Sequence, residues 1–426
     1  MSDSAVFELG CGAQSYDWGK LGKDGSKVSH FAQGLPNFQY DEEKPYAELW
    51  MGTHPSCPST LLASGQDLKQ YLSDHPELLG EKVIKKFGGK DLPFLFKVLA
   101  IRKALSIQAH PDKDLAKRLH DEKPDVYKDP NHKPEMAVAL TDFSGFCGFR
   151  PPSQIASFLS TVTEFSAVID SSVSSSFQSK FSSSAAKVSE EDKKQGLKEM
   201  FTSLMKADSE LVKSQVSSLL SRLEEVQGIS KEEKELIKTL NRDFEGDVGI
   251  FCTFVLNIVR LKPGEAVFLK ANEPHAYLDG DIMECMATSD NVVRAGLTPK
   301  LRDVPTLTTM LTYTSSPPSD QILPPVSFRS TSHTTLYDPP IDEFSVLLTV
   351  LEQGETEKFE GIDGPSILIF TELNGGNGQA GLKFKGEEIK VEREGQVFFV
   401  GAGEEIQVEA KKGKVVAYRA FVEADQ

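Results

Sequence analysis

The chain has 426 residues, 39% of them hydrophobic and 26% charged, which is an ordinary globular composition with room for two or three domains. Its formal net charge of −16 argues against nucleic acid or an anionic membrane as a partner, because both are negatively charged themselves. We find no apolar run long enough to span a membrane and no secretory signal pattern. The five cysteines are scattered without a Cys-x-x-Cys pair, so we expect reduced thiols, no thiolate zinc site and a cytoplasmic location.

The first 150 residues mix short apolar runs with glycine and proline and are expected to be rich in strands. Residues 92–101, LPFLFKVLAI, predict a buried strand. Residues 111–123, PDKDLAKRLHDEK, begin with a proline and acidic residues and then place Leu115 and Leu119 four apart. That pattern predicts a short helix.

Residues 151–245 differ in character and predict a block of helices. The serine-rich residues 171–184 are predicted to be a flexible connection, with a surface loop or a weak helix as alternatives. Ser189 and the acidic residues after it form an N-cap pattern, and a second capping pattern opens residues 230–240. The apolar residues that recur at helical spacing are Leu197, Phe201 and Leu204, then Val212, Val216, Leu219, Leu223 and Val226, with Gly228 closing the second stretch.

Strand patterns return at residue 248 and continue to the end of the chain. Residues 248–269 and 281–287 are predicted to form strands. The proline- and serine-rich residues 315–327 predict a domain boundary. Beyond residue 343, short apolar runs alternate with glycine at turn spacing, which is typical of a β-sandwich or jelly roll.

Two strand–turn–strand segments resemble each other within the chain. Residues 263–275, PGEAVFLKANEPH, align with residues 394–406, EGQVFFVGAGEEI, on a shared turn glycine. This alignment places His275 of the first copy opposite Ile406 of the second. The similarity arises either by chance or from two related β-domains, of which only the first keeps a polar site.

The segment SIQAHPDK, residues 106–113, raises the question of a metal site. On an extended strand, Ser106, Gln108 and His110 share one face, while Ile107 and Ala109 point to the other. One interpretation is a polar edge strand. The other is that Gln108 and His110 form half of a metal site.

Glu135 and His275 would complete such a site. Lys133 and Glu135 lie two residues apart at the start of a later predicted strand, and His275 follows the apolar residues 266–269. Two histidines, a glutamate and an amide oxygen make a nitrogen and oxygen ligand set suited to zinc, with one position open for a substrate. A satisfied histidine or a solvated turn is the more common explanation of such residues, so spacing alone does not establish a metal site.

Longer blocks of sequence, taken in order, resemble a known family. The blocks are YDWGK (16–20), KPYAELWMGTHPS (44–56), PFLFKVL (93–99), LSIQAHPDK (105–113), NHKPEMAVAL (131–140), FCGFRP (146–151) and NEPHAYLDGDIMECMATSDNVVRAGLTPK (272–300). Together they resemble the type I mannose-6-phosphate isomerase family over the whole chain. The resemblance implies a mainly β fold, with two cupin-like jelly-roll β-domains and an inserted α-helical domain.

The resemblance also implies how the chain is divided and what it binds. The implied units are a catalytic β-domain of residues 1–150 plus 246–315, a helical insertion of residues 151–245, and a C-terminal β-domain of residues 316–426 without metal ligands. One zinc ion per chain would be held by Gln108, His110, Glu135 and His275.

The implied activity interconverts mannose 6-phosphate and fructose 6-phosphate through an enediol, which feeds GDP-mannose synthesis and mannose catabolism. Such a reaction needs a polarised carbonyl, a stabilised enediolate and an acid/base group. Zinc would serve as a Lewis acid, and Arg294 would stabilise negative charge or orient the substrate. As the proton-transfer base, Lys133 and Glu284 rank ahead of Asp290 and of a zinc-bound water.

Several residues in the same blocks are candidates for substrate contacts. Ser106, Lys97, Lys133 and Lys300 are expected near the phosphate, because lysine offers a point charge and serine a hydrogen bond. Trp18 would pack against the sugar and Glu48 would bond its hydroxyls or support the metal ligands, with structural roles as the alternative for both. Asp290 is also assigned to substrate binding.

Two other kinds of function compete with the isomerase. An iron oxygenase could use His110, Glu135 and His275 as its two-histidine, one-carboxylate triad, but Gln108 as a fourth ligand favours zinc. A sugar-phosphate sensor on the same fold would not need an intact ligand set. We therefore expect an enzyme with a sugar-phosphate substrate, monomeric, whose helical block forms a lid or wall over the cleft.

Overall fold

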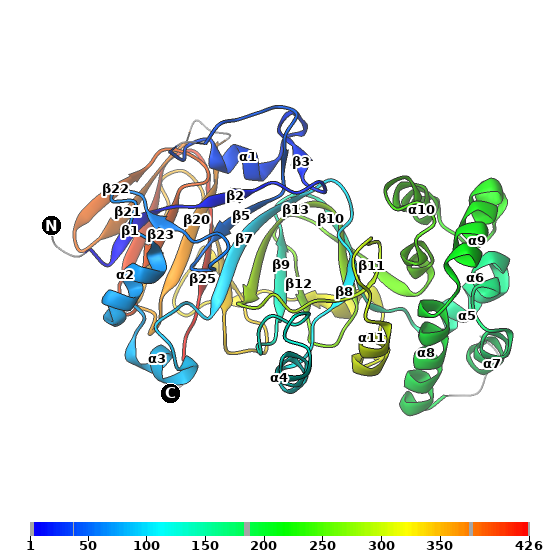
Figure 1. Ribbon diagram of the computed structural model, residues 1–426. Coiled ribbons are helices and arrows are strands. Elements are labelled where there is room, and N and C mark those ends of the chain that lie inside the picture. Colours follow the sequence, from blue (N-terminus) through cyan, green and yellow to red (C-terminus); the bar gives the residue numbers. More distant parts are fainter. Residues whose placement is uncertain (1–3, 37, 183–187, 375–377, 425–426) are drawn as a thin grey trace.

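The structure, a computed structural model, describes residues 4–36, 38–182, 188–374 and 378–424. Figure 1 shows an elongated molecule with the C-terminal strands at one end, a second β-domain in the middle and a block of helices at the other end. The predicted fold class is confirmed: the β-domains are cupin-like and the helices form an insertion between strands β10 and β11.

Three sheets make up the β-domains. The eight-stranded sheet has the order β16 (Val326–Ser327), β17 (Thr334–Tyr337), β18 (Ser345–Leu351), β25 (Val415–Phe421), β20 (Ser366–Leu373), β23 (Val397–Val400), β1 (Val6–Gly10) and β6 (Thr60–Leu61). The four-stranded sheet has the order β19 (Thr356–Phe359), β24 (Ile406–Lys412), β21 (Gln379–Phe384) and β22 (Glu387–Val391).

The third sheet, which we call the central sheet, has eleven strands. Its main path is β15 (Ile322–Leu323), β12 (Ala266–Leu269), β9 (Glu135–Ala139), β13 (His275–Ala287), β7 (Phe94–Ile101), β5 (Glu48–Met51) and β2 (Gly12–Gln14). Strands β10 (Phe143–Phe149), β11 (Leu256–Leu261), β8 (Ile107–Ala109) and β14 (Val293–Gly296) extend it beside β13. A small separate ladder pairs β3 (Lys20–Leu21) with β4 (Pro45–Tyr46).

The sheets are stacked, with apolar side chains between them. One core fills the C-terminal domain between the four- and eight-stranded sheets and includes Leu382, Phe398 and Ala417. A second core joins the eight-stranded sheet to one face of the central sheet, where Phe96 and Met283 meet Phe399. Burial of these faces is the main favourable contribution to the stacking.

Side-chain alternation leaves the other face of the central sheet free to carry polar groups. On β13, Met283 and Cys285 point into the second core, so Glu284 between them must point to the opposite side. The same period places Lys97 of β7 and Glu48 of β5 on that side, and all three side chains are buried. The central sheet therefore presents a row of buried charges on one face.

The helices lie mainly outside this stack. Those before the insertion are α1 (Lys27–Ala32), α2 (Leu68–Asp74), α3 (Glu81–Phe87) and α4 (Lys113–Glu122), and α11 (Val304–Met310) follows it. The insertion contains α5 (Pro152–Thr161), α6 (Thr163–Ala167), α7 (Ser171–Phe181), α8 (Glu190–Met205), α9 (Ser209–Arg222) and α10 (Lys231–Asp243). Short 3-10 helices are η1 (Gly22–Asp24), η2 (Pro76–Leu78), η3 (Leu223–Glu225), η4 (Val248–Phe254) and η5 (Pro318–Gln321).

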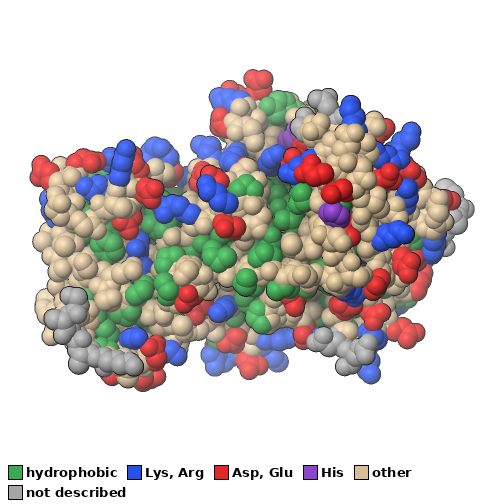
Figure 2. All heavy atoms as spheres, turned by 180° about the vertical axis from the view of Figure 1, so that it is seen from behind, with side chains coloured by type: hydrophobic (Ala, Val, Ile, Leu, Met, Phe, Trp, Pro, Cys, Tyr) green, Lys and Arg blue, Asp and Glu red, His purple; other side chains and the backbone are tan. Residues whose placement is uncertain are grey.

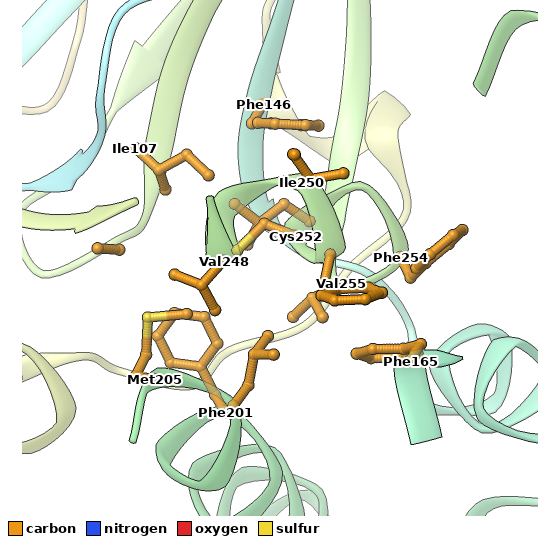
Figure 3. Close-up of a cluster of buried hydrophobic side chains, with 14 of the residues drawn as sticks. Ile107, Phe146, Phe165, Phe201, Met205, Val248, Ile250, Cys252, Phe254 and Val255 are labelled. Carbon is orange, nitrogen blue, oxygen red and sulfur yellow. The ribbon is translucent and has the colours of Figure 1, made fainter. Parts of the chain in front are cut away.

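The helical insertion shares a continuous core with the β-domain that contains the central sheet. Figure 3 shows Val248 and Ile250 of η4 between Phe201 on the helical side and Ile107 and Phe146 on the sheet side. Because Ile107 belongs to β8, the insertion forms the wall behind the strand that carries Gln108.

Several predicted elements agree with the structure, and two do not. The strand at 92–101, the helix at 111–123 and the N-cap at Ser189 are confirmed by β7, α4 and α8. Residues 248–254 form the 3-10 helix η4, so the strand predicted there was wrong. Every residue of η4 is buried, and a run that is apolar throughout has no period that distinguishes a helix from a strand.

The predicted flexible connection at 171–184 was also wrong over most of its length. Residues 171–181 form α7, the weak-helix alternative, and residues 183–184 lie outside the described residues. Asp170 caps the helix by accepting from the amides of Ser172 and Val173 at 2.9 and 3.3 Å. Phe177 and Phe181, four residues apart, bury its apolar side in the helical core.

The internal repeat and the domain division stay predictions, and the strand order can be compared with each of them. Strand β12 precedes His275, the first residue of β13, just as β23 precedes Ile406, the first residue of β24. However, β1 near the N-terminus pairs with β23 of the C-terminal domain. Strand pairing therefore crosses the sequence boundary drawn between the two β-domains.

Charged and hydrophobic side chains are distributed unevenly over the surface (Figure 2). Figure 2 shows acidic and basic side chains interspersed over both ends of the visible face, with hydrophobic side chains concentrated towards its middle. No helix in the described ranges has the length and apolar character needed to cross a bilayer.

Candidate metal centre and active site

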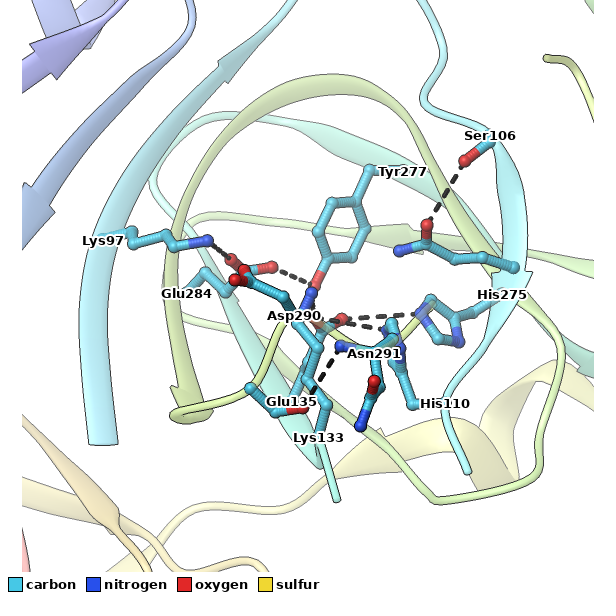
Figure 4. A network of polar contacts seen from close by, with 12 residues as sticks. Lys97, Ser106, His110, Lys133, Glu135, His275, Tyr277, Glu284, Asp290 and Asn291 are labelled. Atoms are coloured by element: carbon cyan, nitrogen blue, oxygen red, sulfur yellow. Dashed lines mark hydrogen bonds and ion pairs between the residues drawn. The ribbon is translucent and has the colours of Figure 1, made fainter. Parts of the chain in front are cut away.

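The two histidines and the glutamate predicted as ligands lie together. Glu135 is the first residue of β9, His275 is the first residue of β13, and His110 directly follows β8 (Figure 4). Glu135 Oε1 is 3.4 Å from His110 Nε2, and Glu135 Oε2 is 3.4 Å from His275 Nε2. All three side chains are at most 2% exposed.

Backbone carbonyls orient both imidazole rings. His110 Nδ1 lies 2.7 Å from the carbonyl oxygen of Asn291, and His275 Nδ1 lies 3.1 Å from that of Glu273. A carbonyl oxygen only accepts, so each Nδ1 carries a hydrogen, and in a neutral ring this leaves the lone pair on Nε2. Burial lowers the pKa of His110 to about 4, which keeps this ring neutral near pH 7.

Charges around Glu135 keep it ionised. Lys133 Nζ is 3.1 Å from Glu135 Oε1. Burial alone would raise the pKa of Glu135, but Lys133 and His110 oppose that effect and lower the pKa well below its ordinary value. The site thus offers a carboxylate, the neutral imidazole of His110 and the Nε2 atom of His275.

These three residues fit a metal ion. Glu135 Oε2 and the Nε2 atoms of His110 and His275 are buried without a hydrogen-bond partner in the described part of the chain. The Nε2 to carboxylate distances of 3.4 Å are too long for good hydrogen bonds but match the roughly 3.4 Å between neighbouring ligands of a tetrahedral zinc with bonds of about 2.1 Å. Their donor set suits zinc.

Gln108 and Arg294 flank this group on adjacent strands. Gln108 of β8 is paired with His275 of β13 on one side and with Arg294 of β14 on the other. The Ser106 hydroxyl donates to Gln108 Oε1 at 3.2 Å, so Ser106 and Gln108 share a face as predicted. Arg294 has no side-chain hydrogen bond or ion pair to any described residue, so its guanidinium is available to a ligand.

A second charged group lies beside the metal ligands on the central sheet. Lys97 Nζ is 3.2 Å from Glu284 Oε2 and 3.6 Å from Glu48 Oε2. The Tyr277 hydroxyl donates to Glu284 Oε1 at 2.8 Å, and Trp50 places its ring 4.8 Å from Lys97 Nζ while its N–H donates to Glu48. The sheet therefore holds this cluster rigidly on strands β5, β7 and β13.

Burial and charge act in opposite directions on the members of this cluster. Burial disfavours the Lys97 ammonium, but Glu48, Glu284 and Glu135 outweigh it and raise the pKa of Lys97. Burial raises the pKa of Glu284, with Lys97 opposing and Glu135 reinforcing the change. Lys97 is thus a fixed cation beside a carboxylate whose proton affinity is increased.

Three further predicted residues are Trp18, Asp290 and Lys300. Trp18 packs on the apolar core of the catalytic domain and stacks on Tyr16 with ring centres 5.8 Å apart. Asp290 is 57% exposed with Oδ1 3.5 Å from His54 Nε2, and the hydrogen bond with His54 lowers the pKa of Asp290. Lys300 is exposed. Among the described residues, no hydrogen bond or ion pair joins these three to a metal ligand, although Lys133 and Lys97 also help to lower the pKa of Asp290, which Figure 4 shows within the network.

Sequence reasoning missed Asn291, Tyr277 and Trp50. Asn291 acts through its backbone oxygen, and its side-chain amide donates to the carbonyls of Asp129 at 2.7 Å and Asn131 at 2.9 Å. The only available signal was that all three lie inside the long sequence blocks already singled out.

Family models match three consecutive parts of the chain. The catalytic domain of phosphomannose isomerase type I matches residues 6–152, its helical insertion domain matches residues 168–256, and its C-terminal model matches residues 335–378. The chain belongs to the type I phosphomannose isomerase family. The resemblance predicted from the sequence blocks is confirmed, and so is the expectation of an isomerase.

Relatives of this phosphomannose isomerase family member match it over nearly its full length. The mannose-6-phosphate isomerase of Cryptococcus neoformans is 50% identical over 99% of both chains. That of Saccharomyces cerevisiae is 46% identical over 98% of this chain and 99% of the relative.

Solved structures of the family have the same fold. A variant of phosphomannose isomerase from Salmonella typhimurium gives a TM-score of 0.82 at 30% identity, covering 99% of this chain and 100% of that one. The crystal structure of a mannose 6-phosphate isomerase bound with zinc and yttrium matches with the same TM-score, identity and coverage.

Proposed function

We propose that the protein interconverts mannose 6-phosphate and fructose 6-phosphate with one zinc ion held by Gln108, His110, Glu135 and His275. The observation that carries the proposal is the convergence of two buried, unpartnered Nε2 atoms on a buried carboxylate. The names of the relatives support the choice of substrate, and the solved relative bound with zinc supports the choice of metal.

Zinc, when bound, would supply a redox-inert Lewis acid for the oxygens around the reacting carbonyl. The protein's own residues provide the rest. Arg294 of β14 lies beside Gln108 of β8, and Lys97 of β7 lies beside β13, which begins with His275. Both cations are suited to orient the sugar phosphate and to stabilise the enediolate. Ser106, which donates to Gln108 Oε1 in this structure, would donate to the phosphate instead once Gln108 binds zinc, with Lys133 and Lys300 adding positive charge.

The structure favours Glu284 over Lys133 as the proton-transfer base. Glu284 is a buried carboxylate whose pKa is raised, which makes it a stronger base than an exposed glutamate. Tyr277 and Lys97 fix both of its oxygens. Lys133 is already paired as a cation with Glu135, so neutralising charge beside the ligand is its simpler role.

Solvent exchange separates these two candidates. In deuterium oxide, the base exchanges the proton at C2 of mannose 6-phosphate with solvent. We expect Glu284→Gln to slow this exchange by about 100-fold or more, and Lys133→Ala to weaken substrate binding with exchange retained. Normal exchange in Glu284→Gln would exclude Glu284 as the base.

The proposal as a whole is tested by turnover and metal removal. Purified protein should convert mannose 6-phosphate to fructose 6-phosphate, lose this activity on treatment with a chelator and regain it on addition of zinc. Oxygen uptake should be absent, which separates the isomerase from an iron oxygenase. Failure to isomerise with zinc fully bound would refute the proposal.

We also propose the cellular setting that the sequence implied. Interconversion of these two hexose phosphates would link GDP-mannose synthesis and mannose catabolism to the fructose 6-phosphate pool. The free state of all five cysteines supports a cytoplasmic location. We propose a monomer in which residues 151–245 form a wall of the active site.

A further inference from the structure

Arg294 lies where the backbone of its strand is irregular. It lies on β14, and the pairing of β14 with β8 shifts register between Arg294 and Gly296. Such an irregularity inserts an extra residue and re-aims the side chains beside it. Since no described residue bonds the Arg294 guanidinium, whatever holds this bulge sets where the guanidinium points.

A carboxylate from the helical insertion's return connection holds the end of the bulge. Asp247 Oδ1 accepts from the amide of Leu297 at 2.7 Å and from that of Gly249 at 2.6 Å. Its Oδ2 lies 3.3 Å from the amide of Thr298. Asp247 therefore caps η4 and binds two successive amides just beyond β14 at the same time.

The backbone at this point needs such support. Leu297 is 1% exposed and has φ of 53°, a left-handed conformation that is unfavourable for a leucine. A Cβ on Gly296 would lie 2.8 Å from the Cα of Gly249, so the two segments touch through glycines. On the other side, Arg302 donates to the carbonyl of Ala295 at 3.1 Å.

We propose that Asp247 is a positioning residue that aims Arg294 at the substrate by clamping Leu297 and Thr298. This inference rests on the proposed function, in which Arg294 contacts the reacting sugar phosphate. It assigns a catalytic consequence to a residue about 50 positions away in sequence, at the junction where the helical insertion returns to the sheet.

A double-mutant cycle tests the clamp. Asp247→Ala should lower kcat/KM by about 10- to 100-fold, the loss expected from a misplacement of ~1 Å, and Arg294→Lys by about 100-fold. In the Arg294→Lys background, adding Asp247→Ala should cost no more than about twofold, because the group it positions is already gone. Asp247→Asn keeps an oxygen for the Leu297 amide and should recover most of the loss. Zinc content should stay at the level of the unsubstituted protein in all variants.

Asp208→Ala is the matched control. Asp208 caps α9 by accepting from the amides of Glu210 at 3.1 Å and Leu211 at 3.0 Å, in the same insertion and with no hydrogen bond to β14. We expect Asp208→Ala to lower the melting temperature by as much as Asp247→Ala does, because each removes a helix cap. The kcat/KM of Asp208→Ala should nevertheless remain within about twofold of that of the unsubstituted protein. If Asp247→Ala does not fold, Asp247→Asn takes its place in the cycle. We expect Asp247→Asn to lower kcat/KM by a smaller factor, and to cause no further loss in the Arg294→Lys background.

The outcomes distinguish this inference from the proposed function. If the unsubstituted zinc-bound protein does not isomerise mannose 6-phosphate, the proposed function fails. If the unsubstituted protein is active and Arg294→Lys is impaired, two results would overturn the inference alone. One is a normal kcat/KM in Asp247→Ala, and the other is a double variant whose loss of kcat/KM equals the product of the two single losses.

Discussion

At the scale of single residues, the ligand cluster is costly to bury without a metal. A buried polar atom that lacks a partner costs about 1–3 kcal/mol, and three such atoms belong to His110, Glu135 and His275. An ion that binds all three removes this cost only in the folded state. Zinc should therefore stabilise the fold as well as enable the reaction.

Substitution of Glu135 tests this link between metal and stability. Glu135→Gln replaces the central carboxylate by a neutral amide, so we expect zinc affinity to fall by about 100-fold or more. Metal content after dialysis should drop, and zinc should no longer raise the melting temperature. Glu164→Gln, which alters a buried carboxylate in the helical insertion, should leave zinc content unchanged; loss of zinc in both variants would point to a general folding defect instead.

The sequence predicted the ligands better than their supports. His110, Glu135 and His275 are marked by residue type and by the blocks around them, and the structure brings them together. Asn291 supports His110 through a backbone oxygen, which any residue type could provide. Trp50 meets Lys97 across neighbouring strands, and that contact depends on a register that the sequence does not show.

At the scale of elements, an ion pair joins two helices of the insertion. Arg222 of α9 donates from Nε and Nη2 to the two carboxylate oxygens of Glu164 in α6, at 2.7 and 2.6 Å. Ser218 Oγ donates to Glu164 Oε1 at 3.2 Å. Hydrogen bonds from Arg222 are the main reason that the pKa of Glu164 is lowered to about 2. Such a two-bond pair fixes the angle between the helices.

This pair predicts a pH-dependent contribution to stability. The folded pKa of Glu164 lies below its ordinary value of 4.5, so the stabilisation is complete above that value and is lost as the pH falls towards about 2. The melting temperature of Glu164→Gln should be lower than that of the unsubstituted protein near pH 7, and the gap should close as the solution is acidified. A gap of equal size at every pH would show that Glu164 stabilises by packing alone.

Elements with a clear period were predicted correctly, and those without one were not. In α8, Leu197, Phe201 and Leu204 recur at helical spacing, and the helix was recovered with its cap. In η4 every residue is buried, so no pattern separates a helix from a strand. In α7 the high serine content favoured the prediction of a flexible connection. The sequence nevertheless contains two indications of a helix, namely the N-cap residue Asp170 and two phenylalanines four residues apart.

At the scale of the whole molecule, one core unites the helical insertion with the catalytic domain. Phe201 of α8 meets Phe149 of β10 edge to face, with ring centres 5.2 Å apart, and both are fully buried. The pairing of β1 with β23 ties the N-terminal strand to the C-terminal domain in a comparable way. Sequence boundaries cannot reveal such pairing, because β1 and β23 lie at opposite ends of the chain.

The shared core predicts that insertion and catalytic domain unfold together. Phe201→Ala should cost about 3–5 kcal/mol and should lower the temperature of the transition that also releases zinc. Calorimetry with a zinc indicator measures both events. Leu382→Ala in the C-terminal core should leave zinc release less affected. A separate early transition of the helices, with zinc retained, would contradict a common core.

The most direct test of the whole account is a zinc titration of metal-free protein, with bound metal and the rate of mannose 6-phosphate isomerisation measured on the same samples. We predict that the rate rises in proportion to bound zinc and stops rising at one ion per chain, and that Glu135→Gln shows neither binding nor rate under these conditions. Full activity without metal, or no activity with the site filled, would contradict the account.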